Sequence, residues 1–200
     1  MTLVFATNNE HKAREINNIL DDNIQLLRLS DVSITEEIPE DEPLIESNAM
    51  FKARYVHERT GLNVFADDTG LEIEALDGLP GVHSARFAGE TKDSSANIAK
   101  VLALLKGIPV RKARFRTVIA LIFENKEYLF EGTVDGTIIE EKRGTEGFGY
   151  DPVFIPDGGD KTFAQMPLAE KNKISHRAIA FGKLKEFLHQ QSLAEKKANA

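Results

Sequence analysis

The chain contains no cysteine among its 200 residues, and none of its apolar runs is long enough to span a membrane. The absence of cysteine excludes both a disulfide framework and a thiolate metal site. The opening residues, MTLVFATNN, turn polar too early for a signal peptide, so we expect a soluble protein of the cytoplasm. Acidic residues outnumber basic ones by 32 to 25, and the formal charge of −7 argues against general binding to a nucleic-acid backbone. An anionic ligand would therefore need a local basic pocket, together with a divalent cation.

The remaining composition is that of a globular protein. Hydrophobic residues make up 42% of the chain and charged residues 28%, which is sufficient for a sizeable core. We expect residues 1–191 to form a single domain, or two lobes that share one sheet. The polar residues 192–200, SLAEKKANA, are expected to form a frayed tail.

Hydrophobic periodicity predicts alternating strands and helices, followed by a hairpin. Helices are predicted over residues 12–20, 44–60, 97–106 and 175–190. Strands are predicted at 3–6, 23–29, 63–66, 71–76, 114–123, 128–139 and 153–156. The acidic stretch 33–43 is interrupted by Pro39 and Pro43, which is typical of a loop. The predicted fold class is therefore α/β with a mixed sheet.

The segment TNNEHK, from Thr7 to Lys12, joins the first predicted strand to the first helix. Backbone N–H groups and the helix dipole at such a junction favour an anion, and Lys12 adds a full positive charge. Asn8 is a residue type that tolerates positive φ, which permits a tight turn around a phosphate. The same residues also fit an ordinary strand–turn–helix connection, with Thr7 or Asn9 as the N-cap.

The stretch FADDTG, residues 65–70, places two adjacent carboxylates behind a short apolar run, and we predict an acidic turn between two strands. A bound Mg²⁺ would stabilise both carboxylates in their ionised form, so that Asp68 could contact the metal and accept a proton from an attacking water. Thr69 and Gly70 would let the backbone approach a ligand closely. The alternative is an exposed turn with Gly70 in a left-handed conformation. Glu40, in the acidic loop, is a candidate second metal ligand, although such runs are usually only solvated.

Two later segments contain candidate base-binding residues. GTEGFGYDP presents Phe148 and Tyr150 from a glycine-rich stretch, and stacking of a base on an aromatic ring contributes about 1–3 kcal/mol. The alternative for Tyr150 is a place in the core. In LAEKNKISHR, Ser175 is a good N-cap for a helix that begins with His176 and Arg177. Two potential cations at a helix start oppose the helix dipole, which indicates either a functional site or a solvated basic helix start.

Together these segments resemble the inosine triphosphate pyrophosphatase family, whose members hydrolyse deaminated purine nucleoside triphosphates. The resemblance covers residues 7–177 and rests on TNNEHK, NAMFKAR, FADDTGL, LPGVHSARFAGE, GFGYDP and EKNKISHR, in this order. It implies an elongated mixed β-sheet flanked by helices, two lobes with a central cleft, a homodimer and a requirement for Mg²⁺. The implied products are a nucleoside monophosphate and pyrophosphate.

The resemblance also implies roles for individual residues. Asp68 matches the family's proton acceptor and metal ligand, with Glu40 as the second carboxylate. Lys12 and Lys52 match residues that reach the phosphates, and Asp67 would support the turn or a water. The implied substrate-binding residues are Thr7, Asn8, Asn9, Glu10, His11 and Lys12 for the triphosphate, Thr69, and Phe148, Gly149, Tyr150, Asp151, Lys171, His176 and Arg177 for the base and sugar.

Two positions depart from the family's usual pattern. Ser47 stands at the acidic position before the lysine of the second helix, and Glu46 lies one residue earlier, which weakens a metal role for Glu46. Asn8 stands where glycine is frequent. On this interpretation water attacks the α–β phosphoanhydride, Asp68 takes its proton, and the metal and the lysines stabilise the departing pyrophosphate.

Two other functions fit parts of the same pattern. Maf-like pyrophosphatases act on other modified nucleotides within a similar architecture, but SHR together with GFGYDP favours a purine substrate. A non-catalytic module that binds purine nucleotides is a second alternative. Such a module would not require Asp68 together with Lys12 and Lys52, so the presence of all three favours an enzyme.

Overall fold

The computed structural model describes residues 1–17 and 24–198 and is built around one mixed β-sheet. Its strands are β1 (Thr2–Phe5), β2 (Gln25–Arg28), β3 (Val64–Ile73), β4 (Pro80–Gly81), β5 (Lys112–Phe123), β6 (Lys126–Ile138) and β7 (Phe154–Pro156). The order across the sheet is β2-β1-β3-β5-β6-β7, and the short β4 pairs with β3. β1 is parallel to β2 and β3, whereas the later pairs are antiparallel. The predicted α/β class with a mixed sheet is confirmed.

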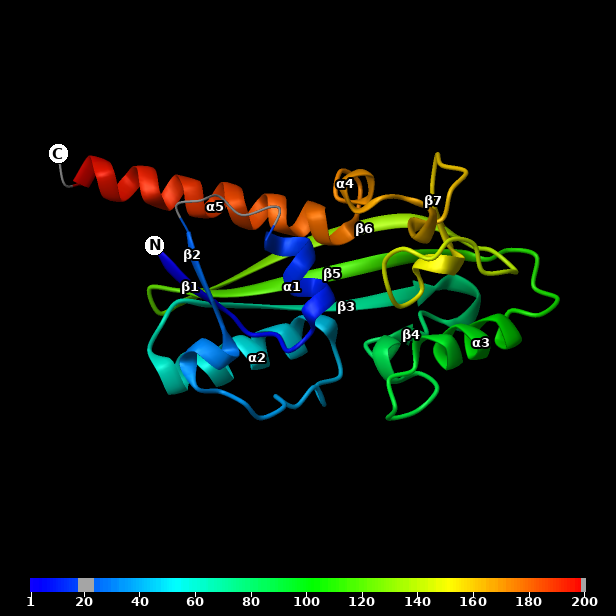
Figure 1. Ribbon diagram of the computed structural model, residues 1–200, viewed down its shortest axis with the longest axis horizontal. Coiled ribbons are helices and arrows are strands. Elements are labelled where there is room, and N and C mark those ends of the chain that lie inside the picture. The colour runs from blue at the N-terminus through cyan, green and yellow to red at the C-terminus, as the bar shows by residue number, and fades with distance from the viewer. Residues whose placement is uncertain (18–23, 199–200) are drawn as a thin grey trace.

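Helices cover both faces of the sheet, and the molecule is elongated along the three longest strands (Figure 1). The helices are α1 (Glu10–Asn17), α2 (Ile45–Thr60), α3 (Ser94–Leu104), α4 (Leu168–Lys171) and α5 (His176–Ala198). Figure 1 shows α5 along one face, with α2 and α3 on the other. Among the described residues, no helix has the length and apolar character needed to cross a membrane.

The side chains of β3 alternate between two apolar clusters, as the two-residue period of a strand requires. Ala66 packs in the cluster that contains Ala49 and Ala53 of α2. Phe65 packs on the opposite face, where its ring contacts Phe181 of α5 with centroids 5.7 Å apart. A third cluster fills the other end of the molecule, around α3, β7 and the ends of the long strands. The two ends of the sheet therefore have separate cores, which gives the two lobes.

The acidic stretch at Asp67 and Asp68 lies inside a strand, so the predicted turn between two strands is wrong. β3 runs without interruption from Val64 to Ile73, and it pairs residue by residue with β5. Asp67 pairs with Ile119 and Asp68 with Val118. The backbone of both residues is thus held in a central ladder, and their carboxylates must be stabilised by partners from other elements.

The ends of three helices differ from the predictions, and one of them, α3, spans Ser94–Leu104 where residues 97–106 were expected. α1 begins at Glu10 rather than at residue 12, and the predicted residues 18–20 lie outside the described part of the chain. α5 continues to Ala198, so the polar segment that begins at Ser192 is helical where we expected a frayed tail.

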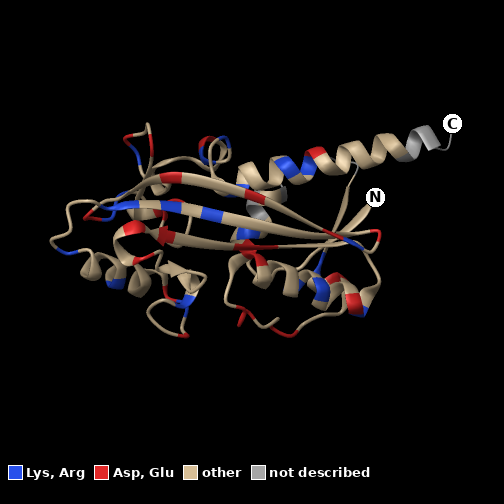
Figure 2. Ribbon diagram, turned by 180° about the vertical axis from the view of Figure 1, so that it is seen from behind, with Lys and Arg blue, Asp and Glu red and all other residues tan. Residues whose placement is uncertain are grey.

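The hairpin of β5 and β6 carries opposite charges side by side, and Figure 2 shows basic segments of β5 next to acidic segments of its neighbours. Arg116 contacts Glu131 of β6 and Glu46 of α2, each at 2.9 Å, and Arg114 contacts Glu72 of β3 at 2.6 Å. The carboxylate of Glu46 is therefore occupied by an arginine on the sheet. This agrees with the sequence argument against Glu46 as a metal ligand.

Candidate active site

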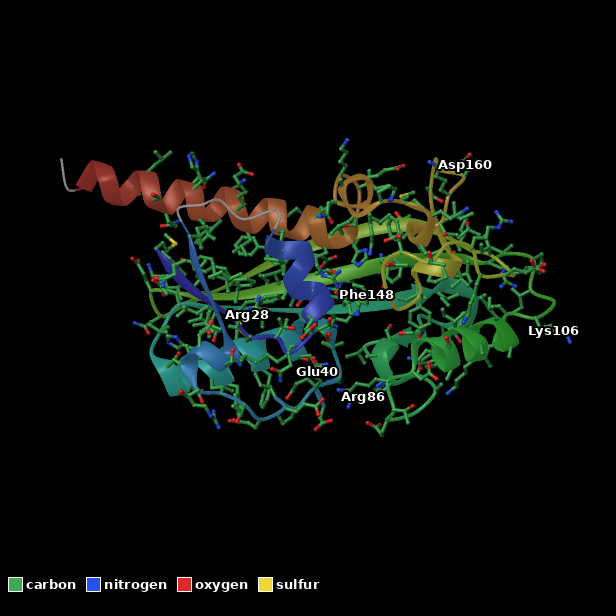
Figure 3. All side chains as sticks on the ribbon, in the orientation of Figure 1. Arg28, Glu40, Arg86, Lys106, Phe148 and Asp160 are labelled. Atoms are coloured by element: carbon green, nitrogen blue, oxygen red, sulfur yellow. The ribbon has the colours of Figure 1, made fainter. Side chains whose placement is uncertain are left out.

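A cavity of ≈ 410 Å³ lies between the two lobes, beside the middle of β3. It is lined by most of the residues that the sequence singles out, namely Thr7, Asn8, Asn9, Lys12, Glu40, Lys52, Thr69, Phe148, Gly149, Tyr150, Asp151, Lys171, His176 and Arg177. Three of the predicted residues are absent from this lining: Glu10, His11 and Asp68. Figure 3 labels Glu40, from the loop before α2, and Phe148, from the loop before β7, which lie on the two sides of this region.

The turn between β1 and α1 is built by two side-chain caps. Thr7 Oγ1 accepts a hydrogen bond from the N–H of Asn9 at 3.1 Å. Asn9 Oδ1 accepts from the N–H groups of His11 and Lys12 at 3.0 and 3.2 Å, which confirms Asn9 as the N-cap of α1. Asn8 does not adopt positive φ, so the predicted left-handed turn at this position is wrong. The caps shape the turn without that conformation, and its phosphate-binding role stays a prediction.

Asp67 is completely buried and is surrounded by cations. Its Oδ2 lies 3.0 Å from Lys12 Nζ and 3.5 Å from Arg177 Nε. Its backbone carbonyl accepts hydrogen bonds from Lys52 Nζ at 2.8 Å and from Lys12 Nζ at 3.3 Å. Burial acts to raise the pKa of Asp67, but the charges of Lys12, Arg177 and Lys52 outweigh it, and the pKa is lowered. Asp67 thus fixes three cations around one strand position, whereas the sequence assigned it to a turn or a water.

Asp68 has the opposite environment, although it is the next residue. Its side chain is almost buried, and Oδ1 accepts the N–H of Thr69 at 2.9 Å. Oδ2 is buried and has no hydrogen-bond partner. Burial raises the pKa of Asp68, and the charges of Lys52 and Lys12 only partly oppose this shift. A carboxylate with a free oxygen and a raised pKa has the properties of a general base.

Lys52 connects Asp68 to the acidic loop that precedes α2. Its Nζ lies 2.6 Å from Glu40 Oε1. Burial acts to raise the pKa of Glu40, but the charge of Lys52 lowers it below the usual value. Burial likewise acts to lower the pKa of Lys52, while Asp68, Glu40 and Asp67 together raise it. Lys52 therefore stays charged although it is buried, with Asp68 and Glu40 nearby.

The opposite end of the cavity is organised around Asp151. Its Oδ2 accepts hydrogen bonds from Lys171 Nζ at 2.7 Å and from the N–H of Phe148 at 2.9 Å. Gly147 has φ of 72° and its Cα packs against the same carboxylate, since an added Cβ would lie 2.0 Å from Oδ2. The Phe148 ring stacks on His11, with centroids 5.3 Å apart and an interplanar angle of 22°.

Two aromatic residues of this end belong to the core. Tyr150 is buried, its hydroxyl donates to the carbonyl of Ser84 at 2.9 Å, and burial raises its pKa. Tyr150 thus packs in the core and also lines the cavity, and its substrate-binding role stays a prediction. His176 stacks on Phe115 with centroids 4.6 Å apart, and burial together with the charges of Arg177 and Lys171 lowers its pKa well below the usual value.

The start of α5 is buried, so the alternative interpretation of a solvated basic helix start is wrong. Ser175 Oγ accepts from the N–H of Ala178 at 3.1 Å and confirms the predicted N-cap. Arg177 donates from Nη2 to Thr69 Oγ1 at 3.3 Å, in addition to its contact with Asp67. The electrostatic conflict at the start of this helix is therefore relieved by a carboxylate on β3, far away in the sequence.

Comparison with known proteins places this chain in a family. A model of the Ham1 family matches residues 3–187. The chain belongs to the Ham1 family. Its curated relatives include proteins named dITP/XTP pyrophosphatase from Porphyromonas gingivalis and Christiangramia forsetii. The first is 53% identical over 187 residues, covering 93% of this chain and 96% of the relative, and the second is 53% identical over 188 residues, covering 94% and 99%.

Solved structures of Ham1 proteins have the same fold. The Ham1 protein of Staphylococcus aureus superposes with a TM-score of 0.88 at 37% identity, and the match covers 96% of this chain and 100% of that protein. The Ham1 protein of Coxiella burnetii superposes with a TM-score of 0.89 at 36% identity, covering 95% and 99%. These matches confirm the resemblance that the six sequence motifs indicate.

The Ham1 cavity also contains residues that the sequence did not single out. Lys92 lines the cavity and contacts Glu37 of the acidic loop, a pair that joins the two lobes at the mouth. Asn97 and Ser84 line it as well, and Phe115 forms its floor beneath His176. Ser84 lies within the motif LPGVHSARFAGE, although the motif did not single it out. Lys92, Asn97 and Phe115 lie in segments with ordinary helix, turn or strand patterns, so no local signal marks these three.

Proposed function

We propose that this protein hydrolyses deaminated purine nucleoside triphosphates such as ITP, dITP and XTP to the monophosphate and pyrophosphate, which keeps them out of DNA and RNA. The observation that carries the proposal is a buried carboxylate, Asp68, that feels the charges of Lys12 and Lys52, two lysines that line the cavity. The names of the Ham1 relatives support the same substrates.

Asp68 acts as the general base in this proposal. Its free Oδ2 accepts a proton from the water that attacks the α–β phosphoanhydride, and its raised pKa strengthens it as a proton acceptor. Thr69, whose N–H holds Oδ1, keeps the carboxylate in one orientation.

Lys12 and Lys52 stabilise the negative charge that develops on the departing pyrophosphate. Both ammonium groups are positioned by the carbonyl oxygen of Asp67, and both belong to walls of the cavity. Because these positions are fixed before substrate binds, little reorganisation is needed as the charge develops.

The residues present fit a divalent cation of the kind that binds with its substrate. Among the described residues, no three His, Asp or Glu side chains form a metal-binding group by themselves. Mg²⁺ commonly uses only one or two carboxylates and takes its other ligands from phosphates and water. Asp68, with its unpaired oxygen, and Glu40 are the two carboxylates that would hold it. When bound, Mg²⁺ would neutralise phosphate charge and polarise the reacting phosphoryl group.

The other end of the cavity holds the base and sugar. Phe148 supplies an aromatic ring, while Asp151 and Lys171 fix the loop that carries it. Arg177, buried between Asp67 and Thr69, supplies hydrogen-bond donors. Donors of this kind match the C6 keto oxygen of hypoxanthine and xanthine but not the C6 amino group of adenine.

Pyrophosphate release from ITP, dITP, XTP, ATP and GTP, with and without Mg²⁺, tests the proposal directly. We expect pyrophosphate rather than single phosphates as the product, the highest kcat/KM with the deaminated nucleotides, and loss of turnover when EDTA removes the metal. Equal rates with all five nucleotides would contradict the substrate assignment. Binding of ITP without any product would instead support a non-catalytic nucleotide-binding module.

Two further features remain predictions from the sequence, the first from the resemblance and the second from the composition and the N-terminus. We propose a homodimer, which the molar mass in solution by light scattering would test. We also propose that the protein acts in the cytoplasm, where nucleotide pools supply nucleic-acid synthesis, and cell fractionation would test this location.

A further inference from the structure

His11, which does not line the cavity, stacks on the ring of Phe148, which does. His11 lies in the first turn of α1, whereas Phe148 lies in the loop before β7, beside α1 in Figure 3. The two rings are nearly parallel, with an interplanar angle of 22° and centroids 5.3 Å apart. This geometry is that of offset stacking, which aromatic rings favour over a direct face-to-face sandwich.

One side of this pair is rigid. The N–H of Phe148 donates to Asp151 Oδ2 at 2.9 Å, and the N–H of Asp151 donates back to the carbonyl of Phe148 at 3.2 Å. Gly147 packs against the same carboxylate, which Lys171 also holds. The half-buried Phe148 ring is thus attached to a backbone fixed on three sides.

The other side of the pair can adapt. The side chain of His11 is exposed, and only its backbone N–H is held, by Asn9 Oδ1 at 3.0 Å. Exposed side chains change rotamer within picoseconds to nanoseconds. The imidazole can therefore leave the Phe148 ring without disturbing the backbone cap of α1.

We propose that His11 is a base-stacking residue, so that the purine base of the substrate lies between His11 and Phe148. This inference rests on the proposed function and changes the role of one residue, because the resemblance assigned His11 to the triphosphate. A ring inserted between two others needs about 7 Å between them, two van der Waals separations of about 3.5 Å. The centroid distance of 5.3 Å is thus short by about 2 Å, which a rotation of the exposed His11 side chain provides.

The position of His11 separates it from its neighbours in the same turn. Lys12, the next residue, points toward Asp67 and lines the cavity, whereas His11 does not line the cavity and contacts Phe148 instead. One turn of α1 consequently serves both ends of the substrate: Lys12 reaches the phosphates and His11 reaches the base.

Calorimetric binding of two ligands, each carrying one end of the substrate, tests this assignment. IMP carries the base, and inorganic tripolyphosphate carries only phosphates. Neither measurement depends on hydrolysis of ITP, so the assignment can be tested even if the proposed function fails. The variants are His11→Ala and His11→Phe, with His189→Ala as the control because His189 is an exposed histidine far along α5.

We expect His11→Ala to weaken IMP binding about tenfold, the loss typical of one stacking contact, with tripolyphosphate binding unchanged. His11→Phe retains a flat ring and should keep IMP affinity close to that of the wild type, as should the His189→Ala control. Equal weakening of both ligands would overturn the proposal in favour of a phosphate role. Tighter IMP binding by His11→Ala, unchanged IMP binding, or no IMP binding by the wild type would also overturn it.

Discussion

Asp67 and Asp68 are consecutive residues of β3, and their carboxylates have pKa values shifted in opposite directions. Because side chains alternate along a strand, Asp67 faces α1 and α5 while Asp68 faces α2. Asp67 contacts Lys12 and Arg177 directly, at 3.0 and 3.5 Å. Asp68 has no such ion pair, although one oxygen of each carboxylate, Oδ1 of Asp67 and Oδ2 of Asp68, has no hydrogen-bond partner.

This difference separates two tasks that adjacent carboxylates would otherwise share. A lowered pKa keeps Asp67 ionised at neutral pH, where it holds Lys12 and Arg177 in place. A raised pKa favours proton uptake by Asp68. Two carboxylates whose environments displace their pKa values in opposite directions are typical of a site in which one is structural and the other accepts protons.

Asp68→Asn should lower kcat for ITP by about 10²–10⁴-fold, because the amide keeps the shape of the side chain but cannot accept the proton. Pyrophosphate release and circular dichroism, measured on the same preparation, separate catalysis from folding. Glu46→Gln is the matched control, because Glu46 pairs with Arg116 on the sheet and does not line the cavity. A folded Asp68→Asn variant with more than a tenth of wild-type turnover would exclude Asp68 as the base.

Asp67→Asn should lower the free energy of unfolding by about 3 kcal/mol, because removing one partner of a buried ion pair leaves the others uncompensated. The side chains of Lys12 and Arg177 are only 12% and 2% exposed, so water cannot replace the lost charge. Urea titration measures the change. The control is Glu127→Gln, whose exposed pair with Arg54 should contribute less than about 1 kcal/mol. Equal effects of the two substitutions would contradict the role of Asp67 as a fixed counter-charge.

The alternation of apolar segments was sufficient to predict the fold class, since strands and helices follow from local periodicity. The assignment of Asp67 to a turn failed for a physical reason: polar residues seldom occupy a central strand unless distant groups neutralise them. Here the neutralising groups are Lys12, Lys52 and Arg177, which are separated from Asp67 by 55, 15 and 110 residues. No local pattern reports contacts of this length.

The candidate site was more predictable than the details of its contacts. Six short motifs were enough to assemble a cavity whose lining contains most of the expected side chains. The stack of His11 on Phe148 and the pair of Lys92 with Glu37 each join segments from different lobes. Their formation depends on how the lobes pack, which the sequence of either segment does not encode.

His176 should make the protein less stable as the pH falls. Its pKa is lowered in the folded state by burial and by Arg177, so the unfolded chain binds a proton that the native state does not. The contribution of His176 to the free energy of unfolding is therefore fully present above the unfolded pKa of about 6.5, and it is lost as the pH falls below that value. Between pH 7.5 and 5.5 we expect a loss of about 1 kcal/mol.

The variant His176→Phe tests this effect, because it preserves the stack on Phe115 and removes the titrating group. Urea titrations at pH 7.5 and 5.5 measure the free energy of unfolding of both proteins. Between these pH values it should decrease less in His176→Phe than in the wild type, by the contribution of His176. Carboxylates with lowered pKa values, such as Asp67 and Glu40, lose their contribution only at more acidic pH and should affect both proteins equally. The same decrease in wild type and variant would show that His176 is not its source.

Arg177 should determine the choice between a keto and an amino group at C6 of the base. An arginine only donates hydrogen bonds, so it can satisfy the keto oxygen of ITP but faces another donor in ATP. Arg177→Lys keeps a positive charge for Asp67 and loses the planar fork, so kcat/KM for ITP should fall by about 10- to 100-fold. The much lower kcat/KM for ATP should fall less, so the ratio of the two kcat/KM values becomes smaller.

Arg111→Lys is the control for this prediction. Arg111 is a buried arginine that lies away from the cavity and donates to the carbonyls of Leu105, Ile138 and Ile139. Equal losses on ITP and ATP in the Arg177 variant would mean that Arg177 contacts phosphate or shapes the cavity, and base selection would then depend on another residue.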